Sequence, residues 1–249
     1  MKFLISNDTV AGRLLRSPLR LIPRETPMRI LRGPLRGKKW IAGAHIHSCW
    51  LGSYESDKQK LFEGVIKEGE TVFDIGANAG FYSMLASVLV GARGRVCAFE
   101  PLPRNVRLLS EHLRINQLAN VQVIEAAVSD VDGETYFDDS PGNAMGHLSD
   151  VGTLRVQTIT IDHWVAQNLL PIPHCLKIDV EGAELLVLAG ARLTIEKHQP
   201  KIFLATHGAA QHEGCCEFLR SLRYRLESID GRLVDECDEL IALPNNDRS

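Results

Sequence analysis

Short runs of β-branched and aromatic residues alternate with amphipathic stretches along most of this chain. Residues 71–75 form the first such run, and the apolar residues between 81 and 89 then recur with the period of one helix face. The same alternation predicts further strands at residues 95–100, 121–128, 175–180 and 201–206, with helices between them. Strands that alternate with helices are typical of a parallel sheet with crossover helices, so we expect a doubly wound, Rossmann-like α/β fold.

Two stretches depart from this alternation. Glycine and proline residues between 133 and 152 predict an irregular insertion, and its polar length suits a loop that faces a substrate. Residues 224–229 and 240–243 are expected to pair as an antiparallel hairpin near the end of the chain.

The N-terminal part differs from the rest in breakers and in charge. Four prolines and three glycines between residues 10 and 37 allow only short helical pieces. We therefore expect a basic arm at residues 1–39, a cap segment at 40–68 and one compact domain at 69–249. One domain with an N-terminal extension is what a chain of 249 residues suggests.

The net charge of −3 hides an asymmetry, because residues 1–39 carry a net +8 and the remainder a net −11. An acidic body repels phosphate, so we expect no nucleic-acid partner. The arm could contact a membrane surface peripherally or pack along the acidic body of the same protein. The oligomeric state is not readable from the sequence.

The location and redox state follow from simple patterns. No apolar run approaches the ~20 residues of a membrane-spanning helix, and the apolar start is too short for a secretory signal. We therefore expect a cytoplasmic protein. The six cysteines lack metal-site or redox spacing, so they are expected to be reduced thiols.

A glycine-bracketed turn is the sharpest local feature. Residues 72–81 read as a strand, a turn from Gly76 to Gly80 and an immediate helix, where the backbone can approach a ligand and helix N–H groups are free to bind it. Glu100 ends the next strand, where a carboxylate can accept both hydroxyls of a ribose. Together these features predict a ligand that contains adenosine.

The details of the turn favour S-adenosylmethionine over a dinucleotide. The turn has the form G-x-x-x-G and lacks the G-x-G start that is used against a pyrophosphate. S-adenosylmethionine presents two cationic groups, an ammonium and a sulfonium, and Asp74 supplies a carboxylate just before the turn.

These residues belong to a longer pattern that resembles the FkbM-like methyltransferases. The resemblance runs in order through GSYE (52–55), FDIGANAGFYS (73–83), AFEP (98–101), AAVSD (126–130), residues 158–162 and LKIDVEGAE (176–184). It covers about residues 50–230. It implies a seven-stranded methyltransferase sheet in the order 3-2-1-4-5-7-6, with the last strand antiparallel.

The resemblance also implies a role for each matching position in binding S-adenosylmethionine. The methionine part would be surrounded by Asp74, Gly76, Asn78 and Gly80, with Ala77 as a further contact in the same turn. Glu100 would hold the ribose, and Ala127 and Val128 would frame the adenine. Phe81, Pro101 and Asn105 would be neighbours of that pocket, and Tyr54 or Glu55 could close over it.

A second group of polar residues lies at the end of the strand that begins at residue 175. Lys177 and Asp179 are on the same side of that strand by alternation, at the switch in strand order where open α/β sheets bind ligands. Asp179 or His207 could take the proton of an acceptor hydroxyl, and Lys177 and Glu181 complete the candidate catalytic set. Glu184 is expected only to stabilise the helix dipole.

A metal is possible at Asp179, Glu181 and His207 but is not expected, since no ligand spacing requires one. We expect a methyltransferase that acts on a hydroxyl of a small molecule, natural product or glycan and releases S-adenosylhomocysteine. Oxygen rather than nitrogen rests on the resemblance alone. Two alternatives stay open: an NAD-type oxidoreductase, and a binding module without catalysis, because Ala205 stands where the family often has a glutamate.

Overall fold

The computed structural model describes residues 21–138, 147–148 and 154–245. The chain divides into two compact units, and the division falls between residues 56 and 57. In the N-terminal unit, β1 (Pro27–Arg29) pairs antiparallel with β2 (Lys39–Ile41), and α2 (Ser48–Leu51) follows. Strand β1 lies in the predicted basic arm and β2 spans the predicted boundary at residue 39. Trp40 and Trp50 are both buried and contribute to the apolar interior of this unit.

The C-terminal unit is built on a seven-stranded sheet in the order β12-β13-β11-β10-β3-β4-β5. Its strands are β3 (Thr71–Ile75), β4 (Arg95–Phe99), β5 (Val121–Ile124), β10 (Cys175–Ile178), β11 (Lys201–Ala205), β12 (Tyr224–Ser228) and β13 (Glu239–Pro244). Numbered along the chain within this sheet, the strands run 3-2-1-4-5-7-6. Neighbours from β5 to β11 pair in parallel, whereas β13 is antiparallel to both β11 and β12.

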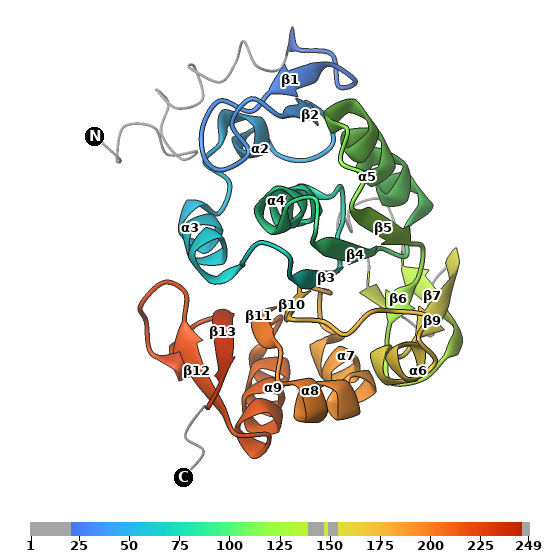
Figure 1. Ribbon diagram of the computed structural model, residues 1–249, viewed down its shortest axis with the longest axis vertical. Helices are drawn as coiled ribbons and strands as arrows, with labels where there is room; N and C mark the ends of the chain where they lie inside the picture. Colours follow the sequence, from blue (N-terminus) through green and yellow to red (C-terminus); the bar gives the residue numbers. More distant parts are fainter. Residues whose placement is uncertain (1–20, 139–146, 149–153, 246–249) are drawn as a thin grey trace. The chain divides into compact units, whose positions relative to one another are not determined.

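Helices cover both faces of this sheet, as the alternation of elements predicted. In Figure 1, α4 and α5 lie on one face and α7, α8 and α9 lie on the other. The helices of this unit are α3 (Ser56–Val65), α4 (Phe81–Val90), α5 (Pro103–Asn116), α6 (Ile161–Ala166), α7 (Glu184–Gly190), α8 (Arg192–His198) and α9 (Ala209–Ser221). The central strands are buried on both faces; Phe73, Leu176 and Leu204 are fully inaccessible. The predicted doubly wound α/β fold is confirmed.

Some predicted elements differ from the observed ones. The expected strand at 121–128 is divided, because the Ala126 N–H donates to the Ile124 carbonyl and turns the chain. Its second part, β6 (Ala127–Val128), joins a separate four-stranded sheet of order β6-β9-β7-β8. That sheet also contains β7 (Gly133–Asp138), β8 (His147–Leu148) and β9 (Leu154–Ile159). The insertion expected at 133–152 is therefore strand in part, and its residues 139–146 and 149–153 lie outside the described ranges.

The single helix expected at 183–193 is two helices. They meet at Ala191, where Asp162 of α6 accepts hydrogen bonds from the N–H groups of Leu193 and Thr194 at 2.8 and 2.7 Å. A carboxylate at this position caps the start of α8. The C-terminal hairpin is present, with the short 3-10 helix η3 (Val234–Glu236) in its connection.

All six cysteines are buried and none forms a disulfide. Among the described residues, no helix has both the length and the apolar character that crossing a bilayer requires.

Candidate active site

The glycine turn and the 179–182 loop leave adjacent strands at the same edge of the sheet. Strands β3 and β10 are parallel neighbours in which Asp74 lies opposite Lys177. Gly76 has φ +79°, and a Cβ at this position would overlap the carbonyl oxygen of Asp179. Glycine is therefore required at residue 76 both for its backbone conformation and for the close approach of the two loops.

The backbone donors of the turn are already in use. The N–H groups of residues 76–80 all bond within the protein: Gly76 and Ala77 to the Phe99 carbonyl, Asn78 to Glu100, Ala79 to the Asn78 side chain, and Gly80 to the Ala77 carbonyl. These turn N–H groups are therefore not available to a ligand, whereas the expectation that N–H groups of the helix beginning at Phe81 bind one stays a prediction. The turn is preformed, and it has carbonyl and carboxylate oxygens to offer a ligand instead.

Glu100 fastens this turn to the next strand. It is 4% exposed, and its Oε2 accepts from the Asn78 N–H at 2.8 Å. Its Oε1 accepts from the Leu102 N–H at 3.0 Å and from Asn105 Nδ2 at 3.2 Å. Burial raises the pKa of Glu100, and the three hydrogen bonds oppose this rise.

A buried lysine bridges the two loops. Lys177 Nζ lies 3.4 Å from Asp74 Oδ1 and 3.3 Å from Asp179 Oδ2, and it donates to the Gly76 carbonyl at 3.4 Å. The second oxygen of Asp74 accepts the Ser83 hydroxyl at 2.6 Å. Asp74 is 1% exposed, and its Oδ1 has no hydrogen-bond partner among the described residues apart from the ion-pair contact with Lys177.

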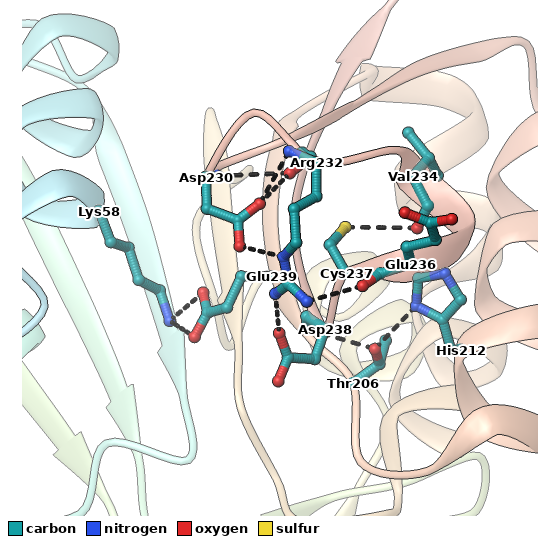
Figure 2. A network of polar contacts seen from close by, with 11 residues as sticks. Lys58, Thr206, His212, Asp230, Arg232, Val234, Glu236, Cys237, Asp238 and Glu239 are labelled. Carbon is teal, nitrogen blue, oxygen red and sulfur yellow. Dashed lines mark hydrogen bonds and ion pairs between the residues drawn. The ribbon is translucent and has the colours of Figure 1, made fainter.

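A second buried lysine was not predicted from the sequence. Lys58 of α3 is 4% exposed and pairs with Glu239 of β13, its Nζ lying 2.7 Å from Glu239 Oε2 (Figure 2). The ammonium groups of Lys58 and Lys177 lie 5.4 and 5.3 Å from the centroid of the Tyr82 ring. These distances are in the range of cation–π attraction, so Tyr82 connects the two lysines.

Three carboxylates lie close to His207. Its Nδ1 lies 2.8 Å from Glu184 Oε1, and its Nε2 lies 3.2 Å from Glu181 Oε2 and 3.9 Å from Asp179 Oδ1. We call Asp179, Glu181 and His207 the rim cluster. Glu184 is fully buried and also accepts the Gly182 N–H at 2.8 Å, so it holds His207 besides acting at the helix start.

Burial and neighbouring charges shift the pKa values of the rim cluster, upward for His207 and Glu181 and downward for Asp179. The hydrogen bond to Glu184 raises the pKa of His207, and the nearby carboxylates add to this against the effect of burial. Burial also raises the pKa of Glu181. For Asp179, burial acts in the same direction, but Lys177, Lys58 and His207 together hold its pKa below the ordinary value.

Other predicted residues are placed around this centre. Ala127 and Val128 of β6 are buried, and Ala127 packs with Leu102. Phe81 is buried at the start of α4, whereas Pro101 is half-buried after β4. Tyr54 and Glu55 lie in the N-terminal unit, so their predicted contacts with the pocket stay predictions.

His112 also holds the turn and was not predicted. It is fully buried in α5, and its Nδ1 lies 2.7 Å from the carbonyl oxygen of Ala79. Burial lowers the pKa of His112 to about 4. Its position three residues after the buried Leu109 was the available signal, because residues at that spacing share a helix face.

The sheet order, the glycine turn at the switch in strand order and the acidic residue after the next strand together define a Rossmann-like methyltransferase fold. The family model of the methyltransferase FkbM domain matches residues 74–226, which is more than half of the chain. The chain therefore belongs to the FkbM methyltransferase family.

Two curated relatives are similar to part of the chain. Hexuronic acid methyltransferase AglP of Haloferax volcanii is 30% identical over 138 residues, which is 55% of this chain and 56% of the relative. 2-O-methyltransferase NoeI of Sinorhizobium fredii is 26% identical over 151 residues, 53% of this chain and 61% of the relative. The chain thus spans little more than half the length of the curated relatives it matches.

The crystal structure of methyltransferase FkbM from Methylobacillus flagellatus KT resembles the fold. The TM-score is 0.53 at 21% sequence identity, and the matched region covers 72% of this chain and 45% of the chain in that crystal structure. This likeness concerns the fold alone.

Proposed function

We propose that the chain transfers a methyl group from S-adenosylmethionine to a hydroxyl oxygen of a sugar. The observation that supports the proposal is the close approach of the glycine turn to the Asp179 carbonyl, because the turn that we propose binds the cofactor then lies beside the rim cluster. One set of residues then binds the methyl donor, and the other faces the acceptor.

The residues present fit S-adenosylmethionine better than a dinucleotide. A pyrophosphate needs backbone donors, and the N–H groups of residues 76–80 are all used internally. Carbonyl oxygens and carboxylates suit the ammonium and the sulfonium of the methionine part. Asp74 is buried against Ser83 and Lys177. We therefore propose that it acts on the ligand through its negative charge and does not contact the ligand directly.

Glu100 is proposed to hold the ribose. Each carboxylate oxygen accepts about two hydrogen bonds, and Oε2 of Glu100 has accepted one, from the Asn78 N–H. That oxygen has capacity for a ribose hydroxyl, while Oε1 is used by Leu102 and Asn105. Asn105 then positions the carboxylate, and Ala127 and Val128 border the adenine.

When bound, S-adenosylmethionine supplies an electrophilic methyl group, whose bond to sulfur breaks as the acceptor oxygen bonds the carbon, leaving S-adenosylhomocysteine. The chain must orient the hydroxyl and promote the loss of its proton. The rim cluster is half-buried and rich in carboxylates, so it suits this second task. Lys177 is buried between Asp74 and Asp179 and is proposed to position Asp179 rather than contact the acceptor.

The acceptor class is supported by the printed names of the relatives. One is named for methylation of a hexuronic acid and the other for 2-O-methylation. From these names we propose a sugar hydroxyl as the acceptor of this chain, and a hexuronic acid is the first acceptor to test.

The test combines calorimetry with an isotope assay on the whole chain. We expect saturable heat with S-adenosylhomocysteine and none with NAD, and methyl transfer to a hexuronic-acid glycoside that Asp179→Asn reduces by at least about 100-fold. Binding of NAD in place of S-adenosylhomocysteine would refute the cofactor. Binding of S-adenosylhomocysteine without transfer to any sugar hydroxyl would favour the noncatalytic alternative.

A further inference from the structure

The three side chains of the rim cluster bring potential metal ligands close together. One donor atom each from Asp179, Glu181 and His207 lies within 4.8 Å of the others. Donors bound to the same ion at about 2.1 Å can lie no more than about 4.2 Å apart. His207 Nε2 meets this limit with Glu181 Oε2 at 3.2 Å and with Asp179 Oδ1 at 3.9 Å, and the donor atoms of Asp179 and Glu181 lie within 4.8 Å of each other.

The histidine is oriented in the way that metal-binding histidines are. Its Nδ1 faces Glu184 at 2.8 Å, which directs Nε2 toward the other two carboxylates. A carboxylate behind the ring fixes the tautomer and makes the free nitrogen a better ligand. Glu184 is fully buried, and its Oε2 has no hydrogen-bond partner among the described residues.

The charges around the rim cluster are out of balance. The carboxylates of Asp74, Asp179, Glu181 and Glu184 are contacted in the described part of the chain by Lys177 and His207. Lys177 is shared between Asp74 and Asp179, and Lys58, whose charge also acts on Asp179, is ion-paired with Glu239. Partly buried negative charges that exceed their partners are costly, and a divalent cation would offset the excess.

We propose that Asp179, Glu181 and His207 bind one divalent cation that accepts both carboxylate and imidazole ligands, such as Mn²⁺ or Zn²⁺. Two carboxylates and an imidazole favour these ions over Ca²⁺, which prefers six or more oxygens. Three protein ligands leave coordination positions for an oxygen of another molecule. If the proposed function holds, that oxygen is the acceptor hydroxyl, whose pKa the cation lowers.

Metal binding is tested directly, without an activity assay. The whole chain is treated with chelator, dialysed and titrated with Mn²⁺ while free Mn²⁺ is followed by electron paramagnetic resonance, and separately with Zn²⁺ and Ca²⁺ by calorimetry. We expect one Mn²⁺ per chain, Ca²⁺ binding at least about tenfold weaker, and selective paramagnetic broadening of the His207 ring signals.

Variants locate the ion. Glu181→Gln and His207→Ala should each weaken Mn²⁺ binding at least tenfold, and Glu184→Gln about 10- to 100-fold through the orientation of His207. His212→Ala and Glu217→Gln are matched controls on α9 that should change it less than twofold; Figure 2 shows His212 directed at Thr206 instead. Circular dichroism checks that each variant is folded.

The outcomes separate the two proposals. Absence of saturable Mn²⁺ and Zn²⁺ binding, or binding unchanged in both His207→Ala and Glu181→Gln, would overturn the metal site. Calorimetry with S-adenosylhomocysteine on the same preparations reports on the proposed function alone. Cofactor binding without Mn²⁺ binding therefore removes only the metal site, and the reverse removes only the proposed cofactor.

Discussion

Acid should destabilise this protein through His112. The imidazole is fully buried and bonds the Ala79 carbonyl within the glycine turn. Its pKa is about 4, below the ordinary value of 6.5. The unfolded chain therefore binds a proton between these two pH values that the folded chain does not. The stability that His112 contributes is present above pH 6.5 and is lost as the pH falls toward 4.

The size of the effect follows from the difference between the two pKa values. Each unit corresponds to about 1.4 kcal/mol, so the whole shift is worth roughly 3 kcal/mol below pH 4. At pH 5 about 2 kcal/mol of this has been lost. That is a large part of the ~5 to 15 kcal/mol that holds a typical domain folded.

Urea unfolding at pH 7.5 and pH 5.0 measures the loss in the wild type and in His112→Gln. The variant is expected to be less stable at pH 7.5 by about 1 to 3 kcal/mol, because the Ala79 carbonyl loses its partner. It should lose about 2 kcal/mol less than the wild type between the two pH values, since the carboxylates titrate alike in both. His163→Gln, at an exposed histidine, is the control. Equal losses in the wild type and His112→Gln would refute the reasoning.

Three further predictions concern the residues around the glycine turn. Gly76→Ala should unfold the protein, or lower its free energy of unfolding in urea by more than about 3 kcal/mol. The control is Gly231→Ala, which has nearly the same φ of +80° but open space around it and should cost only about 1 kcal/mol. Similar costs for the two variants would refute the steric argument. Glu100→Gln should weaken S-adenosylhomocysteine binding at least tenfold in calorimetry while the exposed Glu134→Gln does not, and unchanged affinity in both would exclude Glu100 from the ribose site. Lys58→Met should destabilise the protein by about 1 to 3 kcal/mol by removing the ion pair with Glu239, and adding Glu239→Gln should recover part of that loss. Strictly additive costs would show that the pair is not coupled.

The sequence predicted the central strands well because they are buried on both faces. Residues 71–75 are apolar apart from Thr71 and Asp74, and residues 201–205 are apolar apart from Lys201. Mostly apolar runs are typical of parallel strands between two helical layers. Strand β7 was missed because its flanking turn residues outweighed the short β-prone segment. The break between α7 and α8 depends on Asp162, about thirty residues earlier, and no local pattern records that contact.

The candidate site shows the same division between local and distant information. Alternation along one strand predicted that Lys177 and Asp179 share a side, and their charged groups lie 3.3 Å apart. The contact of Lys177 with Asp74 needs the register of β10 against β3, and the contact of Lys58 with Glu239 joins residues 181 positions apart. Neither follows from spacing, because it is the folded sheet that sets these distances.

The same limit explains why Glu184 was assigned a role that was too small. Its place in the first turn of a helix accounts for its bond to the Gly182 N–H, and that local reason is sufficient by itself. The structure adds His207, which arrives from the end of the neighbouring strand and turns this carboxylate into the support of the rim cluster. A carboxylate needed only for the helix dipole would sit at the surface, whereas Glu184 is fully buried. Burying a charged group is costly unless the group is paired. The contact with His207 gives the buried Glu184 a partner, and Glu184 in turn orients the His207 ring.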